Sequence, residues 1–202
     1  MNKQVPSRKL FILYSVILIL MAISMRSTNN MVVTTVPLYS KYILNFSYIG
    51  TALVTAIIYL GTVLATLLIN PIMGSILRKR MFIIANFVLT GLMISYYFSG
   101  AISVFMISFV IGLAYGIILP NIVTSATLYP DRTAREKLLG IYSVGLSFSL
   151  VFGPSLETYL LTLVSYRTLF LFFAPLGLIG IVTSFFMEFP KKWNNYFRKG
   201  KT

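Results

Sequence analysis

The chain has 202 residues, of which 57% are hydrophobic and only 10% are charged. A soluble protein needs roughly a quarter of its residues charged to cover its surface, so this composition excludes a water-soluble globular domain. Cys and His are absent, which excludes disulfides, thiolate catalysis, imidazole bases and most transition-metal sites, and we expect neither a cofactor nor a bound metal.

Long uncharged stretches mark the membrane spans. Residues 81–130 carry no charge and would run about 75 Å as one helix, against a hydrocarbon core of about 30 Å, so they cross twice. The sequence therefore predicts an all-α integral membrane protein with six transmembrane helices in residues 10–187, between an N-terminal segment at 1–9 and a basic tail or linker at 188–202. The spans are expected at roughly 10–38, 47–72, 81–99, 101–128, 138–163 and 168–187.

The basic residues indicate the orientation. Apart from Arg26, Lys41 and Arg167, every Lys and Arg lies before span one, between spans two and three, between spans four and five, or after span six. Cytoplasmic segments of membrane proteins carry such an excess, so both termini are expected in the cytoplasm. The net charge of +13 is then mostly an orientation signal toward the lipid bilayer, and no nucleic-acid partner is expected.

Span one carries a polar group at depth. Arg26 lies about 24 Å along the span, and Asn29 and Asn30 follow on the same helical face. Glu157 lies about 28 Å along span five, at a comparable depth, which invites an ion pair with Arg26. One hypothesis is that Arg26, Asn29 and Asn30 line a polar cavity, with Glu157 as counter-ion or coupling group. The alternative is that span one ends near Arg26 and that Glu157 lies at the outer interface.

Span two carries a polar stripe along one helical face. A wall against a pore would place Thr55, Tyr59 and Thr62 at the cavity. The hydroxyls could equally bond their own backbone or a neighbouring helix, and the sequence leaves both interpretations open. The stripe comprises Thr51, Thr55, Tyr59, Thr62, Thr66 and Asn70.

Spans four and five contain helix-modifying residues. Gly112 and Gly116 have a spacing that permits close approach of another helix. Pro120 frees backbone carbonyls, as in the broken helices near transport sites, so Asn121 joins the candidate cavity residues. A bend is expected where Gly153-Pro154 interrupts span five.

Two segments carry a resemblance to a known family. A basic loop with Arg132 and Arg135 precedes a helix that opens with Gly140 and closes on Gly153-Pro154, and Tyr166-Arg167-Thr168-Leu169-Phe170 follows. These motifs resemble the loop after span four and the Trp-Arg-x-x-Phe start of span six in the major facilitator superfamily. The resemblance covers about residues 9–190 and implies the amino-terminal half of that fold, built from two inverted three-helix repeats.

The resemblance has departures. The family's loop between spans two and three reads roughly Gly-x-x-x-Asp-Arg-x-Gly-Arg-Lys, whereas this chain lacks the Asp and the second Gly. A proton-relay Arg in span four and the complete Gly-Pro-x-x-Gly-Gly antiporter motif are also missing, so drug/proton antiport is not supported. The structural or gating residues that the resemblance implies are Gly74, Arg78, Lys79, Arg80, Arg135, Gly140, Gly153 and Pro154.

The resemblance implies a secondary transporter, or its amino-terminal half, that moves a small solute across the cell membrane by alternating access. Complete members have two six-helix halves, so a second half or a homodimer is an expected partner. An Arg at the site would suit an anionic solute. The competing class is a non-transporting membrane scaffold or an inactive truncated half, in which the polar stripe of span two would be buried against other helices. An enzyme is not expected, because catalytic groups are lacking.

Overall fold

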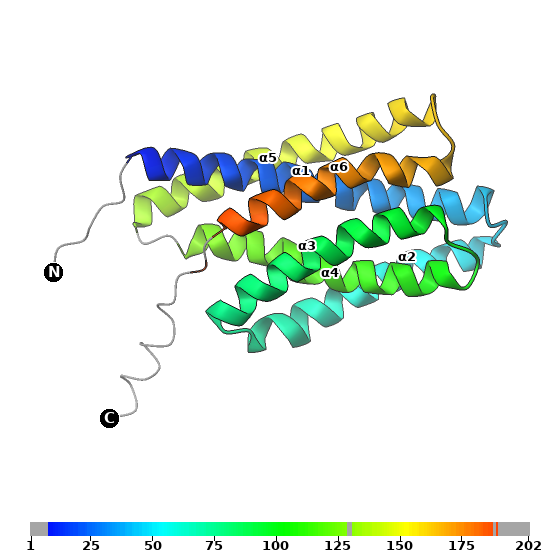
Figure 1. The fold of residues 1–202 in the computed structure, drawn as a ribbon, viewed down its shortest axis with the longest axis horizontal. Coiled ribbons are helices and arrows are strands. Elements are labelled where there is room, and N and C mark those ends of the chain that lie inside the picture. The colour runs from blue at the N-terminus through cyan, green and yellow to red at the C-terminus, as the bar shows by residue number, and fades with distance from the viewer. Residues whose placement is uncertain (1–7, 129–130, 188, 190–202) are drawn as a thin grey trace.

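The computed structural model describes residues 8–128, 131–187 and 189. Most of the N-terminal segment at 1–9 and nearly all of the tail at 188–202 lie outside the described residues. Within them the chain is helical without any strand, and the helices lie along one another in an elongated bundle (Figure 1).

Six described helices are long and apolar enough to cross a membrane, which confirms the predicted number. The second continues through a π-helical turn (Ala65–Ile69) and a 3-10 turn (Asn70–Ile72). The helices are α1 (Arg8–Tyr42), α2 (Tyr48–Leu64), α3 (Ser75–Tyr97), α4 (Ser103–Thr127), α5 (Arg132–Leu161) and α6 (Tyr166–Phe186).

Two helices begin earlier than predicted. Helices α3 and α5 start six residues before the expected positions 81 and 138, so the basic residues of those segments lie in helical turns rather than in loops. Long basic side chains can extend from a helix toward water, so their charge does not end the helix. Asp131 caps α5, and its carboxylate accepts a hydrogen bond from the backbone N–H of Ala134 at 2.8 Å.

Neither Pro120 nor Pro154 ends its helix. Helix α4 runs through Pro120 to Thr127, and α5 runs through Gly153-Pro154 to Leu161. Both helices therefore continue past their prolines, as the spans expected at 101–128 and 138–163 require. Neighbouring side chains can satisfy the carbonyls that a membrane proline leaves without a donor, which allows the helix to continue.

The packing order shows the internal symmetry. Helix α1 packs mainly on α5, α2 mainly on α4, and α3 on α6, with further contacts of α1 with α6 and of α3 with α4. Exchanging the first three helices for the last three leaves this set unchanged. Because α1 and α4 run in opposite directions (Figure 1), the two units are inverted three-helix repeats, as the resemblance implied.

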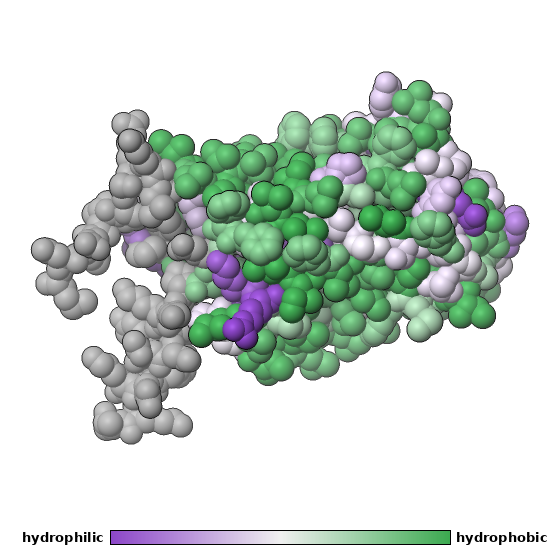
Figure 2. Space-filling model, in the orientation of Figure 1, coloured by the Kyte–Doolittle hydropathy of each residue, from purple (hydrophilic) through white to green (hydrophobic). Residues whose placement is uncertain are grey.

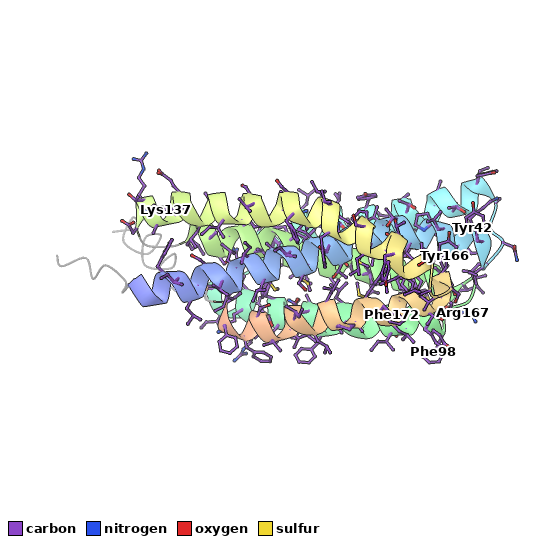
Figure 3. The ribbon with its side chains drawn as sticks, turned by 90° about the horizontal axis from the view of Figure 1, so that it is seen from above. Tyr42, Phe98, Lys137, Tyr166, Arg167 and Phe172 are labelled. Carbon is purple, nitrogen blue, oxygen red and sulfur yellow. The ribbon has the colours of Figure 1, made fainter. Side chains whose placement is uncertain are left out.

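The two ends of the bundle differ from its sides. We call the end where α1, α3 and α5 begin the basic end. Figure 3 shows Lys137 there, with Tyr42, Tyr166 and Arg167 at the opposite end. The visible side in Figure 2 is mostly hydrophobic, whereas hydrophilic residues gather toward the ends. The sides expose large apolar side chains such as Phe87 of α3, at 51%. Such a surface belongs in lipid, so the chain is an integral membrane protein.

Candidate functional site

Helices α1 and α5 run in the same direction and touch closely. A Cβ placed at Gly153 would lie 2.9 Å from the carbonyl oxygen of Ser27, so only a glycine permits this approach. Pro154 follows it, partly buried. The contact brings the polar residues of both helices together in what we call the α1–α5 seam. Its members are Arg26, Asn30, Thr34 and Thr35 of α1, with Tyr142, Ser149 and Glu157 of α5.

Arg26 lies near the middle of α1 and is partly buried. Its Nη2 donates a hydrogen bond to the Tyr142 hydroxyl at 2.9 Å, and its buried Nε has no partner in the described part of the chain. A guanidinium has five N–H donors, so donors remain for a ligand. Tyr142 was missed by sequence reasoning, and the only signal would have been its place on α5 just after Gly140.

Asn29 and Asn30 extend the polar face of α1. Asn30 donates from Nδ2 to the Ser149 carbonyl at 3.3 Å, and Asn29 is partly exposed beside it. The structure therefore places all three predicted polar residues of α1 within one helical face, and two of them bond α5. The alternative in which span one ends near Arg26 is wrong, because α1 continues to Tyr42.

Glu157 belongs to the same seam but not to an ion pair with Arg26. Its side chain is only 4% exposed. Thr35 donates to Oε1 at 2.6 Å and Thr34 donates to Oε2. In the described ranges the one ion pair joins Arg132 and Glu136, so the expected pairing of Arg26 with Glu157 is wrong.

Arg26 and Glu157 do not pair because the register of α1 and α5 keeps them at different levels of the bundle. Arg26 precedes Thr34 by eight residues, which is about 12 Å along α1, and its side chain bonds Tyr142 instead. Glu157 lies four residues before the end of α5, about 6 Å from it by helical rise. Its carboxyl is thus close to the end of the bundle opposite the basic end, yet buried against α1.

The polar stripe of α2 divides into two parts. On the part nearer the basic end, Thr62 donates to the Ile58 carbonyl at 2.9 Å and lies 3.1 Å from the Gly112 carbonyl oxygen. Thr66 and Asn70 bond α4 at Gly116, at 3.2 Å and 2.7 Å. We call this contact the α2–α4 seam. The Thr62 and Thr66 hydroxyls and the Asn70 amide thus contact backbone carbonyls of a neighbouring helix, which is one of the two interpretations that the sequence leaves open.

Pro120 explains why Gly116 accepts two hydrogen bonds from α2. A proline has no N–H, so the Gly116 carbonyl loses the donor that residue 120 would supply within α4. Close approach at Gly112 and Gly116 lets α2 supply donors instead, because a Cβ at either position would collide with the α2 backbone. The prediction that Gly112 and Gly116 permit close approach of another helix is confirmed.

Asn121 lies within the α2–α4 seam. It is 1% exposed, and its Nδ2 donates to the Ile117 carbonyl at 2.6 Å and to Asn70 Oδ1 at 3.1 Å. The structure places it between two helices rather than at an open surface.

The other part of the stripe is more exposed. Thr55 is partly exposed and bonds its own helix at the Thr51 carbonyl, 3.3 Å away, and Tyr59 is 52% exposed. Thr55, Tyr59 and Thr62 therefore differ in exposure and in hydrogen-bond partners, and their place at a cavity stays a prediction.

The residues implied for structure or gating at the basic end differ in their contacts. Arg78 donates hydrogen bonds to the carbonyl oxygens of Asn70 and Met73, at 3.4 and 3.3 Å, and so binds the 3-10 turn that follows α2. A Cβ at Gly74 or Gly140 would meet open space, so packing does not require glycine there. The remaining basic residues are Lys79, which is partly buried, Arg80, which is exposed, and Arg135, whose Nε is buried with no partner among the described residues.

Comparison with known proteins adds one finding. A family model described as Major Facilitator Superfamily matches residues 15–202. This range includes both seams and all six described helices except the first two turns of α1. A search of curated proteins gives no match.

Proposed function

The chain belongs to the Major Facilitator Superfamily, a family of membrane transporters rather than enzymes, and from this premise we propose that it is one six-helix half of a secondary transporter that moves a small solute by alternating access. The described helices supply one pair of inverted three-helix repeats, which is the content of one half. The partner in the cell membrane is a second six-helix half or a second copy of the chain, and both termini face the cytoplasm.

The observation that carries the proposal is the state of Arg26. A guanidinium in the middle of a membrane helix is costly and marks a functional site in most membrane proteins. Arg26 is partly exposed and its Nε has no partner among the described residues, while Asn29 and Asn30 share its face. The planar donor fork suits a carboxylate or a phosphate, so the solute is a small anion.

The alternative of a non-transporting scaffold draws support from the α2–α4 seam. A stripe that bonds neighbouring carbonyls is what such a protein requires, and Thr62, Thr66 and Asn70 do so. That seam contains no charged residue, whereas the α1–α5 seam contains two. The two functions therefore differ in whether water reaches the α1–α5 seam.

Thiol labelling distinguishes the two functions, because the chain has no Cys of its own. Single variants Asn30→Cys and Thr34→Cys in the α1–α5 seam should react with a charged, membrane-impermeant thiol reagent. Thr62→Cys should react slowly, since its side chain bonds α4. The matched controls are Ser108→Cys in the core, at 0% exposure, and Val182→Cys on the lipid-facing side, at 59%. No reaction at Asn30→Cys and Thr34→Cys would contradict transport through this seam.

The same chemistry tests the orientation. Lys79→Cys at the basic end should be labelled only when the reagent reaches the cytoplasmic side. Asn45→Cys, in the exposed turn between α1 and α2, should be labelled in intact cells. The reverse pattern would invert the proposed topology.

A further inference from the structure

When it is ionised, the carboxyl of Glu157 carries a charge that no basic residue of the described helices neutralises through an ion pair. It is 4% exposed, and its hydrogen-bond partners are the Thr34 and Thr35 hydroxyls. A buried carboxylate without a cation is costly in a membrane, where such groups are normally paired. Two hydroxyl donors reduce that cost but leave the net charge in place.

No basic residue of the described helices packed on α5 forms an ion pair with Glu157. Helix α1 supplies Arg8 and Lys9 in its first turn, Arg26, which bonds Tyr142 about 12 Å before Thr34 by helical rise, and Lys41, whose Nζ lies 3.9 Å from the centroid of the Tyr48 ring. Helix α4 has no charged residue, and the one charged residue of α6 is the exposed Arg167 in its first turn. The basic residues of α5 itself lie at its other end.

Thr34 has more than one place for its hydroxyl hydrogen. Besides Glu157 Oε2, its Oγ1 lies 3.0 Å from the Asn30 carbonyl oxygen and 3.0 Å from the Met31 carbonyl oxygen. A hydroxyl donates one hydrogen and can accept others. Thr34 can therefore donate to an ionised carboxylate, or accept from a protonated carboxyl while donating to its own helix.

We propose that Glu157 is a proton-binding site and that Thr34 is the hydroxyl that accommodates both of its states. On binding, a hydronium ion transfers one proton to Oε2, so one O–H bond of the hydronium breaks, one O–H bond forms at the carboxyl and a water molecule leaves. The new O–H donates to Thr34 Oγ1, and the hydroxyl hydrogen of Thr34 turns to the Asn30 or Met31 carbonyl. The site gains one proton and one unit of positive charge, and no electron is transferred. Thr35 donates to Oε1 in both states.

The spacing of the oxygens favours a proton over a metal ion. Thr35 Oγ1 and Glu157 Oε1 are 2.6 Å apart, a direct hydrogen bond. Oxygens that share a metal ion each lie about 2.0–2.6 Å from it, which separates neighbouring ligands by about 3 Å or more. A metal ion would have to push these oxygens apart, whereas a proton requires only that one hydroxyl rotate.

The site lies next to the group proposed to bind the solute. The Asn30 carbonyl is one of the alternative acceptors of Thr34, and the Asn30 side chain bonds Ser149 on the face that carries Arg26. Proton binding would thus alter the hydrogen bonds of a residue in the solute site. This coupling rests on the proposed function, whereas proton binding itself does not.

Infrared difference spectroscopy between low and high pH tests the site directly. The full chain, carrying ¹³C-labelled Glu, would be measured in lipid nanodiscs as wild type and as the variants Glu157→Gln and Thr34→Val. Glu136→Gln, a carboxyl in an exposed ion pair, and Thr158→Val, an exposed hydroxyl that bonds its own helix, are the matched controls. Labelled Glu separates these carboxyls from Asp131.

The wild type should gain a protonated-carboxyl band at low pH that Glu157→Gln loses and both controls keep. Thr34→Val should displace the band, because the O–H loses its acceptor. Persistence of the band in Glu157→Gln, an undisplaced band in Thr34→Val, or its loss when sodium is added at constant pH would overturn the proposal. If Glu157→Gln does not fold, the comparison of Thr34→Val with Thr158→Val decides. The thiol labelling above tests transport separately, so either proposal can fail alone.

Discussion

The α1–α5 seam and the α2–α4 seam each join the two inverted repeats and are equivalent under their exchange, yet they are built differently. The α2–α4 seam closes through glycines on both helices, and its polar side chains donate to backbone carbonyls or bond each other. The α1–α5 seam brings a guanidinium, a phenol and a carboxyl to the same kind of contact. The same contact between helices is therefore closed by glycines and backbone hydrogen bonds in one seam, whereas in the other it contains ionisable side chains.

The difference arises from what each seam leaves unsatisfied. In the α2–α4 seam, the carbonyl freed by Pro120 and the amides of Asn70 and Asn121 all find partners. In the α1–α5 seam, Arg26 keeps a buried N–H without a partner in the described residues, and Glu157 has no ion-pair partner there. Because unsatisfied polar groups are costly in lipid, their presence in the α1–α5 seam is what supports the proposal of a functional site there.

The largest effect is expected from Gly112→Val, which should disrupt the α2–α4 seam. A Cβ at Gly112 would collide with the Ile58 carbonyl, and two packed helix backbones cannot both move aside. Overpacking typically costs ~1–3 kcal/mol, and this rigid contact should reach or exceed the upper value. Thermal unfolding in detergent, followed by circular dichroism, measures the loss. Gly91→Val on α3, where a Cβ meets open space, is the control and should unfold near the wild-type temperature.

Charge exchange in the α1–α5 seam should come next. Arg26→Glu and Glu157→Arg each reverse a charge inside the seam, where the hydrogen-bond partners are uncharged hydroxyls. A charge costs about 2.5–3.5 kcal/mol at the centre of a span and less near its end. Because the two residues do not pair, the double variant should show the summed cost within about 0.5 kcal/mol. The same unfolding measurement gives all three values. If the double variant loses clearly less stability than the two single variants together, Arg26 and Glu157 form an ion pair after all.

A smaller effect is expected from the amide pair of the α2–α4 seam. Asn70→Leu removes the donor to Gly116 and the acceptor of Asn121, and interhelical hydrogen bonds in membranes contribute about 0.6 kcal/mol, up to about 1.7. Asn121→Leu and the double variant complete a cycle, which should show a favourable coupling between them. Thr55→Val, whose hydroxyl bonds its own helix, is the control and should be nearly neutral. An additive cycle would mean that the Asn70–Asn121 bond contributes nothing.

The sequence was sufficient for the helices and for the family. Uncharged stretches locate the six spans because lipid excludes charge, and the Gly112–Gly116 spacing identified a close contact without naming the partner helix. The sequence predicts the starts of α3 and α5 six residues too late, because it assigns the basic residues before each span to a loop. A helix can instead continue through such residues into the membrane–water interface. These errors concern charge at the boundary rather than the existence of the helices.

The partners of the buried charges could not be predicted in the same way. Depth along a span gives the level of Arg26 and of Glu157, but it does not give the register between α1 and α5 or the direction of a long side chain. Thr34 and Thr35 gave a weak signal, as adjacent hydroxyls in an apolar helix eight and nine residues after Arg26. Tyr142 gave almost none, because tyrosines are frequent throughout the chain.

The smallest effect, and the sharpest test of why the two seams differ, is expected from Pro120→Ala. Alanine supplies an N–H that can bond the Gly116 carbonyl within α4, in competition with Thr66 and Asn70 of α2. The stability of Pro120→Ala itself should change by only a few tenths of a kcal/mol, since one hydrogen bond replaces another. The cost of Thr66→Val, however, should become smaller in the Pro120→Ala background than in the wild type. Unfolding measurements on the four chains give this difference, and an unchanged cost would mean that the α2 donors do not depend on the carbonyl that the proline frees.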